Sequence, residues 1–471
     1  MLAGNDIINN VIAGPVYAGH DNNYALSVES MKVITDLHIH SKYARACSRD
    51  LVPVNLAAWA DKKGINILGT GDFTHPAWLG ELKENLEEAK SGLYKVKNSD
   101  SEALFMLTTE LASIYKQGDK VRRVHNLVFA PNFAAVDKLI ALLEKRGVNL
   151  KADGRPMMGV HCDELVRICK EADARIELIP AHAWTPHFGV FGSLSGFDSL
   201  EEAFGEEAKH IFAIETGLSS DPKMNWKVGA LDNITLISNS DAHSLRKLGR
   251  EANVFEIDKE KLSFSEIIRV IRERPPEEFL YTIEFFPEEG KYHLDGHADC
   301  KFSCEPSRTK ELGGICPVCK KKLLRGVMAR VDDLSLLPPL SWGRPGGGEE
   351  SSPFPSPPHQ GEGINRIPFK SIIPLEEIIA DTLGVGPASK KVQAQYEAMV
   401  AQLPEFEILL NANADELTKL GSATLAESIL RVRDGRVHIA GGYDGVFGKI
   451  QIYSSEEREK LLLKPKQSTL F

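Results

Sequence analysis

The sequence has no long apolar run and few cysteines, and both shortages narrow the class of protein. No stretch of the 471-residue chain approaches 18 uninterrupted apolar residues, the length that a membrane-spanning helix needs. Residues 1–30 lack the positively charged opening and the apolar stretch of a secretory signal. Four of the seven cysteines lie between positions 300 and 319, which indicates a reducing compartment and a metal site in place of disulfides. We therefore expect a cytoplasmic protein without membrane contact.

The composition also lacks a basic excess. A formal net charge of −10 with 42% hydrophobic residues is typical of a soluble chain with two or three domains, and it does not indicate nucleic-acid binding. Residues 301–330 are the exception, because they set eight basic side chains against Glu305 and Glu311. These are Lys301, Arg308, Lys310, Lys320, Lys321, Lys322, Arg325 and Arg330. Such a segment favours phosphate binding.

The apolar segment 33–41 ends in His38 and His40, spaced i and i+2. In an extended strand alternate side chains point to the same face, so both imidazoles can reach one metal ion. A lone pair of this kind is weak evidence, because solvated or core histidines are the common alternative. What strengthens the interpretation is that polar ligand residues recur at the ends of later strands.

The pattern of strand, polar residue and helix recurs about seven times. Expected strands cover 33–39, 65–69, 103–107, 124–129, 176–181, 211–214 and 234–238. This α/β pattern predicts a βα barrel with its function at the carboxyl ends of the strands. The candidate metal ligands are His38, His40, Asp72, Glu110, His125, His182, Asp241 and His243.

Imidazole and carboxylate ligands without thiolate suit zinc, manganese, iron or magnesium. Eight such ligands exceed one coordination shell, so we expect two or three divalent ions, with Glu110 as the bridge between them. Neighbouring metal ions can hold a hydroxide and clamp phosphate oxygens, which predicts phosphoester hydrolysis.

The four cysteines between positions 300 and 319 form two pairs. Cys300 and Cys304, followed by Cys316 and Cys319, have the spacing of a four-thiolate structural zinc site. The alternative is a set of reduced cysteines without metal.

In their order, the ligand motifs resemble those of the PHP (polymerase and histidinol phosphatase) metallohydrolases. The resemblance implies a distorted seven-stranded TIM-like barrel with a trinuclear metal site. One departure is visible: many PHP proteins have Asp-His after the second strand, and this chain has Asp72-Phe73, with His75 two residues further on.

Longer blocks at 69–76, 180–186, 215–222 and 238–244 are similar to the endonuclease Q family of DNA repair nucleases. That resemblance implies a metal-dependent endonuclease that cleaves damaged double- or single-stranded DNA on the 5′ side of abasic sites and of deaminated bases, namely deoxyuridine, hypoxanthine and xanthine. The alternatives are a PHP phosphoesterase acting on small phosphomonoesters and a DNA exonuclease.

Several residues are candidates for roles in that reaction. Asp241 is the candidate proton acceptor, and Arg45 either neutralises the scissile phosphate or is an ordinary surface arginine. An enzyme that reads a lesion must turn the base out of the stack into a pocket. The substrate-binding candidates are His75, Trp184, His187, Phe188, Phe191 and Glu215. The alternative for the aromatic residues is that they only pack the loop.

The chain divides into six expected segments. These are an extension that is disordered or not native (1–30), the barrel (31–285), the zinc module (286–333), a low-complexity Pro/Gly/Ser insertion (334–363), a mainly helical α+β domain (364–455) and a tail (456–471). Helices are expected at 77–91, 374–383, 388–402 and 413–433, and a hairpin at 437–450. In the tail, Gln467, Leu470 and Phe471 are similar to peptides that dock on sliding clamps.

Overall fold

The structure, a computed structural model, describes residues 29–336 and 365–463 of the chain. Most of the expected extension and insertion, and the tail residues Gln467, Leu470 and Phe471, lie outside these ranges. Within them, no helix combines the length and apolar character that a bilayer span requires.

The expected seven strands form the wall of a barrel around an apolar interior. They are β1 (Ser30–Asp36), β2 (Ile67–Gly69), β5 (Leu104–Gln117), β6 (Lys120–Ala130), β8 (Glu177–Pro180), β9 (Ala213–Glu215) and β10 (Thr235–Ile237). Strands β1, β2 and β5 are parallel neighbours, and β9 pairs with β10. The wall closes where His40 N donates to Ala242 O at 3.1 Å, beside a parallel bridge between Ile39 and Ala242.

Strand β6 distorts the barrel because it runs antiparallel to both β5 and β8. His125 was expected at the beginning of this strand, but β6 begins at Lys120, so His125 lies in its middle, where it reaches Glu110 of the neighbouring β5. Strand β5 is also longer than expected: it continues from Leu107 to Gln117, so Glu110 lies within the strand and not after it.

Helices and additional strands surround the barrel. The helices are α1 (Pro53–Lys63), α2 (Pro76–Asn85), α3 (Phe133–Lys145), α4 (Cys162–Ala172), α5 (Leu200–Phe204), α6 (Pro222–Asn225) and α7 (Phe264–Glu273). The strands are β3 (Leu86–Lys90), β4 (Leu93–Val96), β7 (Met157–Met158), β11 (Ala252–Asp258), β12 (Phe279–Glu284) and β15 (Phe369–Ser371). Short 3-10 helices are η1 (Gly205–His210), η2 (Gly229–Leu231), η3 (Leu245–Lys247), η4 (Pro287–Glu289) and η5 (Ala298–Cys300).

The helix expected at 77–91 is wrong in its second half. Residues Leu86–Lys90 form β3, which pairs with β4 although its Glu, Ala and Lys residues favour a helix. The turn at Gly92, whose φ is 73°, reverses the chain, and pairing with the following apolar strand overrides the local preference.

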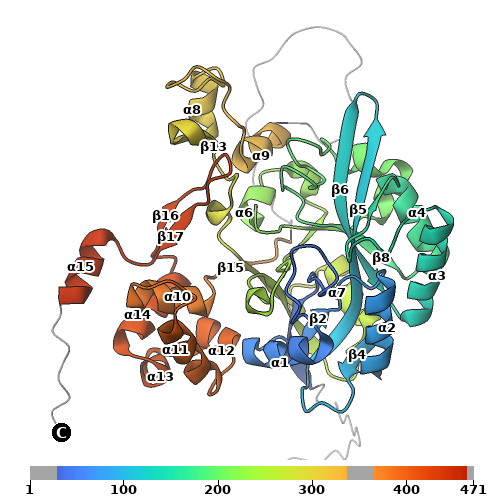
Figure 1. Cartoon of the computed structure of the whole chain (residues 1–471), viewed down its shortest axis with the longest axis horizontal. Coiled ribbons are helices and arrows are strands. Elements are labelled where there is room, and N and C mark those ends of the chain that lie inside the picture. The colour runs from blue at the N-terminus through green and yellow to red at the C-terminus, as the bar shows by residue number, and fades with distance from the viewer. Residues whose placement is uncertain (1–28, 337–364, 464–471) are drawn as a thin grey trace, which may run out of the picture.

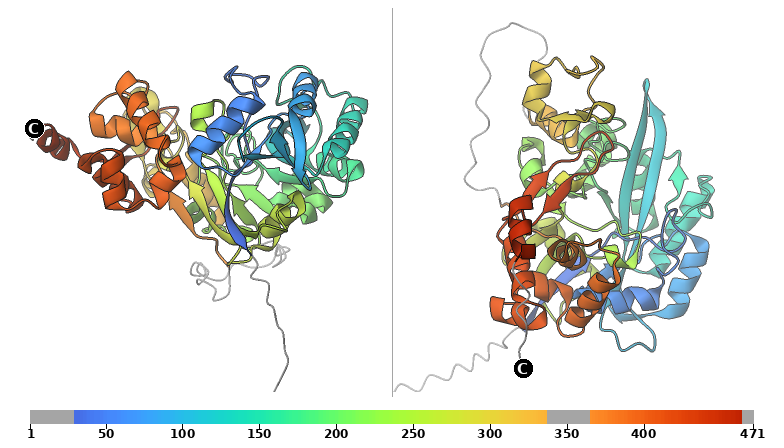
Figure 2. Two further views of the ribbon diagram at one scale, coloured as in Figure 1. Left: turned by 90° about the horizontal axis from the view of Figure 1, so that it is seen from below. Right: turned by 60° about the vertical axis from the view of Figure 1, so that its left-hand side comes forward.

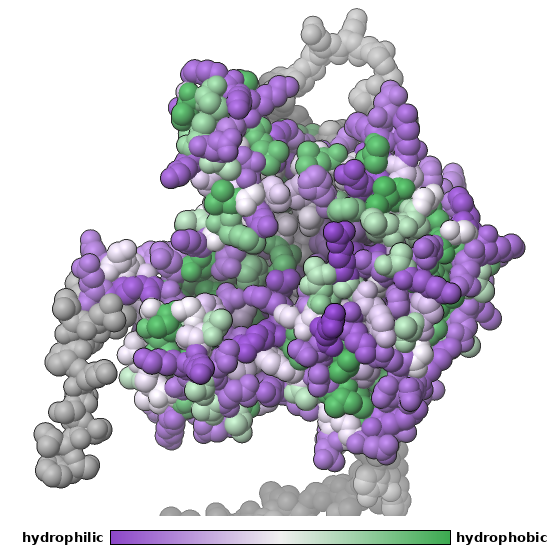
Figure 3. All heavy atoms as spheres, viewed as in Figure 1, coloured by the Kyte–Doolittle hydropathy of each residue, from purple (hydrophilic) through white to green (hydrophobic). Residues whose placement is uncertain are grey.

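The zinc module projects from one end of the barrel (Figures 1 and 2). It contains β13 (Asp295–His297), β14 (Phe302–Cys304), α8 (Pro306–Glu311) and α9 (Val327–Ser335). In the space-filling view the surface is hollowed between this module and the barrel (Figure 3).

The C-terminal part is mainly helical and packs beside the barrel (Figure 2). It contains α10 (Leu375–Leu383), α11 (Lys390–Val400), α12 (Glu405–Leu410), α13 (Ala414–Leu420), α14 (Ala423–Arg433), β16 (His438–Ala440), β17 (Lys449–Gln451) and α15 (Ser455–Leu463). The single helix expected at 413–433 is split, because Ser422 caps a new helix by accepting a hydrogen bond from Leu425 N. Helix α12 was not expected from the sequence.

A buried ion pair joins the C-terminal helices to the barrel. Lys63 Nζ, at the end of α1, lies 2.7 Å from Glu405 Oε2, at the start of α12, and both side chains are about 95% buried. The Tyr396 hydroxyl donates to Glu405 Oε2, and Leu375 N donates to Oε1. The carboxylate is therefore fully partnered only while the two parts are in contact.

We expect Lys63→Met to lower the free energy of unfolding by about 3–5 kcal/mol, because it leaves a buried carboxylate without its counterion. Chemical denaturation measures the change. The matched control is Lys62→Met, since the adjacent Lys62–Glu397 pair is exposed and its loss costs less than about 1 kcal/mol. Equal effects of the two substitutions would contradict this role for Lys63.

Candidate active site

Two groups of metal-ligating side chains meet at the end of the barrel. In the first, ligand atoms of His38, His40, Glu110 and Asp241 lie within 4.8 Å of one another, and in the second, those of Glu110, His125 and His182 do. Glu110 Oε1 is 2.6 Å from His125 Nδ1, and Oε2 is 3.4 Å from His40 Nε2. Because Glu110 belongs to both groups, its position supports the bridging role expected for it.

The environment of His38 fits a metal ion. Its Nδ1 lies 3.0 Å from both oxygens of Glu215, which leaves Nε2 as the metal-facing atom. His38 Nε2 is buried and has no hydrogen-bond partner in the described part of the chain. It lies 3.8 Å from Glu110 Oε1 and 3.7 Å from Asp241 Oδ1. A cation among these atoms would satisfy the nitrogen and balance the carboxylates.

Three candidate residues adopt left-handed backbone conformations where strands turn into loops. The φ angles are 48° for Asp72, 29° for His182 and 48° for Asp241. Such conformations cost non-glycine residues free energy and are concentrated at functional sites. Before Asp72, only glycine fits, because a Cβ on Gly71 would lie 2.3 Å from Ile39 O.

Two of the expected ligands, Asp72 and His243, lie outside both groups. Asp72 Oδ1 is 3.0 Å from His40 Nδ1, and its Oδ2 accepts a hydrogen bond from Ser41 N at 2.6 Å. Asp72 therefore positions His40 from behind. His243 lies beside the first group: its ring is 4.6 Å from that of His40, and its Nδ1 lies 2.8 Å from the backbone oxygen of Asp241.

The carboxylates of the site are held in the ionised form. Burial opposes the charge on Glu110, but hydrogen bonds from His125 and His182 and the charge of Arg155 outweigh it and hold its pKa well below the usual range. The pKa of Asp241 is lowered against burial in the same way by His40 and His38. Burial lowers the pKa of His125 to about 4, so this imidazole is neutral and able to ligate.

Arg155, and not Arg45, is the arginine that reaches the site. The exposed Arg45 contributes only its backbone N–H, which donates to Asp153 Oδ1, and its guanidinium makes no hydrogen bond or ion pair with the described residues. Arg155 Nη1 lies 3.0 Å from Glu110 Oε2. The sequence offered no signal for Arg155, because it lies in a loop remote from every ligand motif.

A cavity of about 380 Å³ opens beside the two ligand groups. It is lined by Phe188, His187, Met157, Leu218, Arg155 and Asp241, among others. The ring of Phe188 lies 4.4 Å from that of His125. Of the expected substrate-binding residues, His187 and Phe188 therefore line this cavity.

The other substrate-binding candidates are placed elsewhere. Trp184 and Phe191 are 1% and 2% exposed and pack on each other, so they belong to the core of the loop, as the alternative interpretation has it. Glu215 is fully buried against His38 and has no access to a substrate. His75 stacks on Tyr43 at 4.5 Å, at the beginning of α2.

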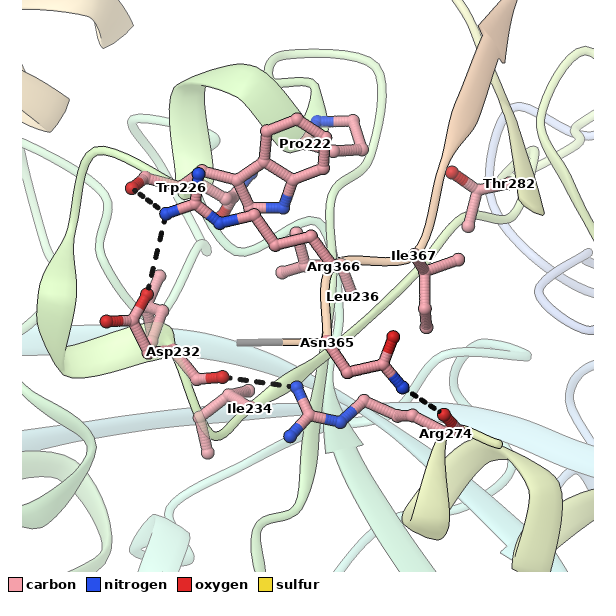
Figure 4. Close-up of a pocket in the computed structure, with 12 residues that line it drawn as sticks. Pro222, Trp226, Asp232, Ile234, Leu236, Arg274, Thr282, Asn365, Arg366 and Ile367 are labelled. Carbon is pink, nitrogen blue, oxygen red and sulfur yellow. Dashed lines mark hydrogen bonds and ion pairs between the residues drawn. The ribbon is translucent and has the colours of Figure 1, made fainter. Parts of the chain in front are cut away.

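A second pocket lies away from the ligand groups, lined by residues of α6, β10 and the segment before β15 (Figure 4). Arg366 lies over the ring of Trp226, and Arg274 donates to the backbone oxygen of Asp232. Its volume of about 20 Å³ holds little more than one water molecule, so it is not a substrate site.

The zinc module gathers three of the four expected cysteines. Ligand atoms of Cys300, Cys316, Cys319 and His297 lie within 4.8 Å of one another. The sulfur of Cys304 instead contacts Thr309 Oγ1 at 3.3 Å. His297 thus takes the place at which Cys304 was expected, because the β13–β14 hairpin pairs His297 with Phe302 and brings it to the cluster. Three thiolates and one imidazole suit zinc.

Comparison with known proteins shows similarity over nearly the whole chain. The lesion-specific endonuclease PfuEndoQ from Pyrococcus furiosus is 30% identical, with a TM-score of 0.74 over 93% of this chain and 98% of that one. Endonuclease Q in complex with a 27-mer duplex substrate, which has an abasic lesion at the active site, is also 30% identical, with a TM-score of 0.74 over 94% and 100% of the two chains.

Two further matches concern parts of the sequence. Residues 374–436 match the family model of the MJ0043 C-terminal domain. Protein MJ0043 of Methanocaldococcus jannaschii is 30% identical over 275 residues, which is 57% of this chain. The match spans about a third (31%) of the length of that relative.

A distorted barrel with these ligand groups defines the class of PHP-like metallohydrolases. Identity at this level over almost the full length of both chains narrows the class further. The chain belongs to the endonuclease Q family, and it is a nuclease that hydrolyses phosphodiester bonds.

We expect Cys304→Ser to retain the zinc of the module, because its sulfur lies outside the ligand group. Cys316→Ser and His297→Ala should each lose one zinc per chain, measured by elemental analysis of the purified proteins. Loss of zinc from Cys304→Ser, with retention in His297→Ala, would instead support the expected site of four cysteine ligands.

We expect Glu215→Gln to raise the metal concentration needed for half-maximal activity by about 10- to 100-fold, because the carboxylate that orients His38 is lost. Glu284→Gln is the matched control. Glu284 is also buried, and burial raises its pKa to about 8, so it is already neutral at pH 7. An unchanged metal dependence in Glu215→Gln would rule out the positioning role.

Proposed function

We propose that this protein is a DNA repair endonuclease that hydrolyses the phosphodiester on the 5′ side of abasic sites and of deaminated bases, namely deoxyuridine, hypoxanthine and xanthine. One observation carries the proposal: two ligand groups share Glu110 and open onto a cavity large enough for a nucleobase. The relative whose structure contains an abasic duplex supports damaged DNA as the substrate.

The residues of the two groups have separate tasks in this reaction. Divalent cations bound there would supply Lewis acidity toward the phosphate and would make water nucleophilic at neutral pH. Asp241, whose side chain is 24% exposed at the cavity, is placed to accept the proton of the attacking water. Arg155, at the same cavity, is placed to neutralise charge on the scissile phosphate.

The cavity walls suit a base turned out of the helix. Phe188 offers an aromatic face for stacking, and Leu218 and Met157 offer apolar contact. Phe188 has a φ of 71°, a conformation that phenylalanine rarely adopts. Its position next to His125 connects the stacking surface directly to the ligand groups.

The zinc module supplies a cationic surface outside the cavity. Its arginines are engaged within the protein: Arg308 pairs with Glu311, Arg325 with Asp333 and Arg330 with Asp198. Five of its lysines, between positions 301 and 322, are exposed and form no ion pair with the described residues. They are Lys301, Lys310, Lys320, Lys321 and Lys322. These lysines are available to the phosphates of a duplex that lies across the hollow.

Two narrower expectations stay predictions. The clamp-docking residues Gln467, Leu470 and Phe471 fall outside the described ranges. A cytoplasmic location rests on the sequence alone.

The proposal is tested with end-labelled duplexes that carry one abasic site, deoxyuridine, hypoxanthine or xanthine, in Mg²⁺ or Mn²⁺. We expect a nick on the 5′ side of each lesion and none in undamaged DNA. Asp241→Asn should lower the rate by about 10²- to 10⁴-fold, because it removes the proton acceptor. Asp100→Asn, a change in an exposed loop carboxylate, is the matched control.

Release of phosphate from small phosphomonoesters without any nick would favour the phosphatase alternative. Degradation from DNA ends, with no cleavage at an internal lesion, would favour an exonuclease.

A further inference from the structure

The hairpin of β5 and β6 extends well beyond the ligand groups that it carries. Figures 1 and 2 show it projecting past the rest of the barrel, at the same end of the molecule as the zinc module. Glu110 lies near the middle of β5, and His125 near the middle of β6. The residues from these ligands to the turn at Gly118 form an arm that the metal site does not need.

The pairing register shows which residues share a face with the ligands. Ala112 is opposite His125, Ile114 is opposite Arg123, and Lys116 is opposite Val121. Opposite residues in an antiparallel pair point to the same face, and every second residue along a strand does so too. The face that carries Glu110 and His125 therefore continues outward through Ile114, Arg123, Lys116 and Val121. Met157, paired with Ala112, joins the same face.

The opposite face of the arm is packed against the protein. Tyr115 is 7% exposed and stacks on His161 at a ring distance of 4.0 Å. Arg122 is 5% exposed, lies over the ring of Phe197 and pairs with Glu202 at 2.5 Å. One face is thus anchored, which holds the arm in place and leaves the ligand-bearing face free.

The free face carries unpaired positive charge. Lys116 and Val121 are exposed and Arg123 is half-buried. Neither cation forms a hydrogen bond through its side chain, nor an ion pair, with any described residue, whereas the neighbouring Arg122 on the anchored face donates to Gly196 O and to Glu202. A half-buried guanidinium without a carboxylate partner is available to an anionic ligand.

We propose that this face of the β5–β6 arm binds the phosphate backbone of duplex DNA on one side of the cleaved bond, through Arg123 and Lys116. The inference rests on the proposed function, since it places the same DNA substrate along the arm. Arginine and lysine contacts to phosphate position a duplex without reading its sequence. Such an arm would set which phosphodiester lies over the ligand groups.

The spacing of the two cations along the arm fits a run of phosphates. At about 3.4 Å per residue, Arg123, which is opposite Ile114, lies about 14 Å along the arm from Glu110, and Lys116 lies about 20 Å from it. One strand of B-DNA presents a phosphate about every 3.4 Å along the helix axis. The two cations therefore correspond to positions about four and about six nucleotides from the cleaved bond.

The test is the affinity for an undamaged duplex, measured by fluorescence anisotropy over a range of salt concentrations with the full chain. Arg123→Gln should weaken binding about 3- to 10-fold. Each removed phosphate contact should reduce the slope of log affinity against log salt by about 0.9, so the double variant Arg123→Gln/Lys116→Gln should lose about twice that. Lys120→Gln is the matched control, because Lys120 pairs with Gln117 on the other face of the same arm.

A series of shortened abasic duplexes provides a second readout. Trimming one side of the lesion from about six to about two nucleotides should raise the KM of the unmodified protein, and the double variant should be insensitive to this trimming. An unchanged salt slope, an equal effect of Lys120→Gln, or the same length dependence in the double variant would overturn the inference. A failure of the unmodified protein to nick the abasic duplex would instead overturn the proposed function, because binding to undamaged DNA does not depend on cleavage. Thermal melting of each variant confirms that it is folded.

Discussion

Glu110 is the residue on which both ligand groups depend. It is almost fully buried, it contacts histidines of both groups, and Arg155 pairs with its outer oxygen. Burial alone would raise the pKa of this carboxyl group and neutralise it. Hydrogen bonds from His125 and His182 and the charge of the Arg155 guanidinium keep it ionised. A carboxylate held in this way can serve two cations at once.

The position of Glu110 within β5 links this chemistry to the architecture. Because β5 continues past the barrel and returns as antiparallel β6, the strand pair that supplies Glu110 and His125 also forms the projecting arm. Glu215 contacts His38 and Asp72 contacts His40, each on the side of the imidazole that faces away from the ligand groups. These two carboxylates therefore orient the two histidines. The cavity lined by Phe188 and Leu218 connects the ligand groups to the surface.

Most of the candidate ligand set was predictable from the sequence, because strand alternation and position after a strand are local properties. His38, His40, Glu110, His125, His182 and Asp241 are brought together as expected. Arg45 and Cys304 are not where the sequence placed them, because Arg45 is exposed and the sulfur of Cys304 contacts Thr309. Asp72 and His243 lie next to the two groups, in contact with His40 and with the backbone of Asp241. Arg155 and His297 take their places through contacts distant in sequence, which no local pattern records.

The sequence by itself determined the order of strands and helices, the ligand chemistry at the barrel end and the cysteine-rich module, since periodicity, spacing and side-chain type are carried by neighbouring residues. Tertiary structure alone decided the antiparallel course of β6, the conversion of Leu86–Lys90 from helix to strand, and the separation of Phe188 in the cavity from Trp184 in the core. These outcomes depend on which surfaces meet after folding, because pairing and burial between distant segments outweigh the local preference of each segment.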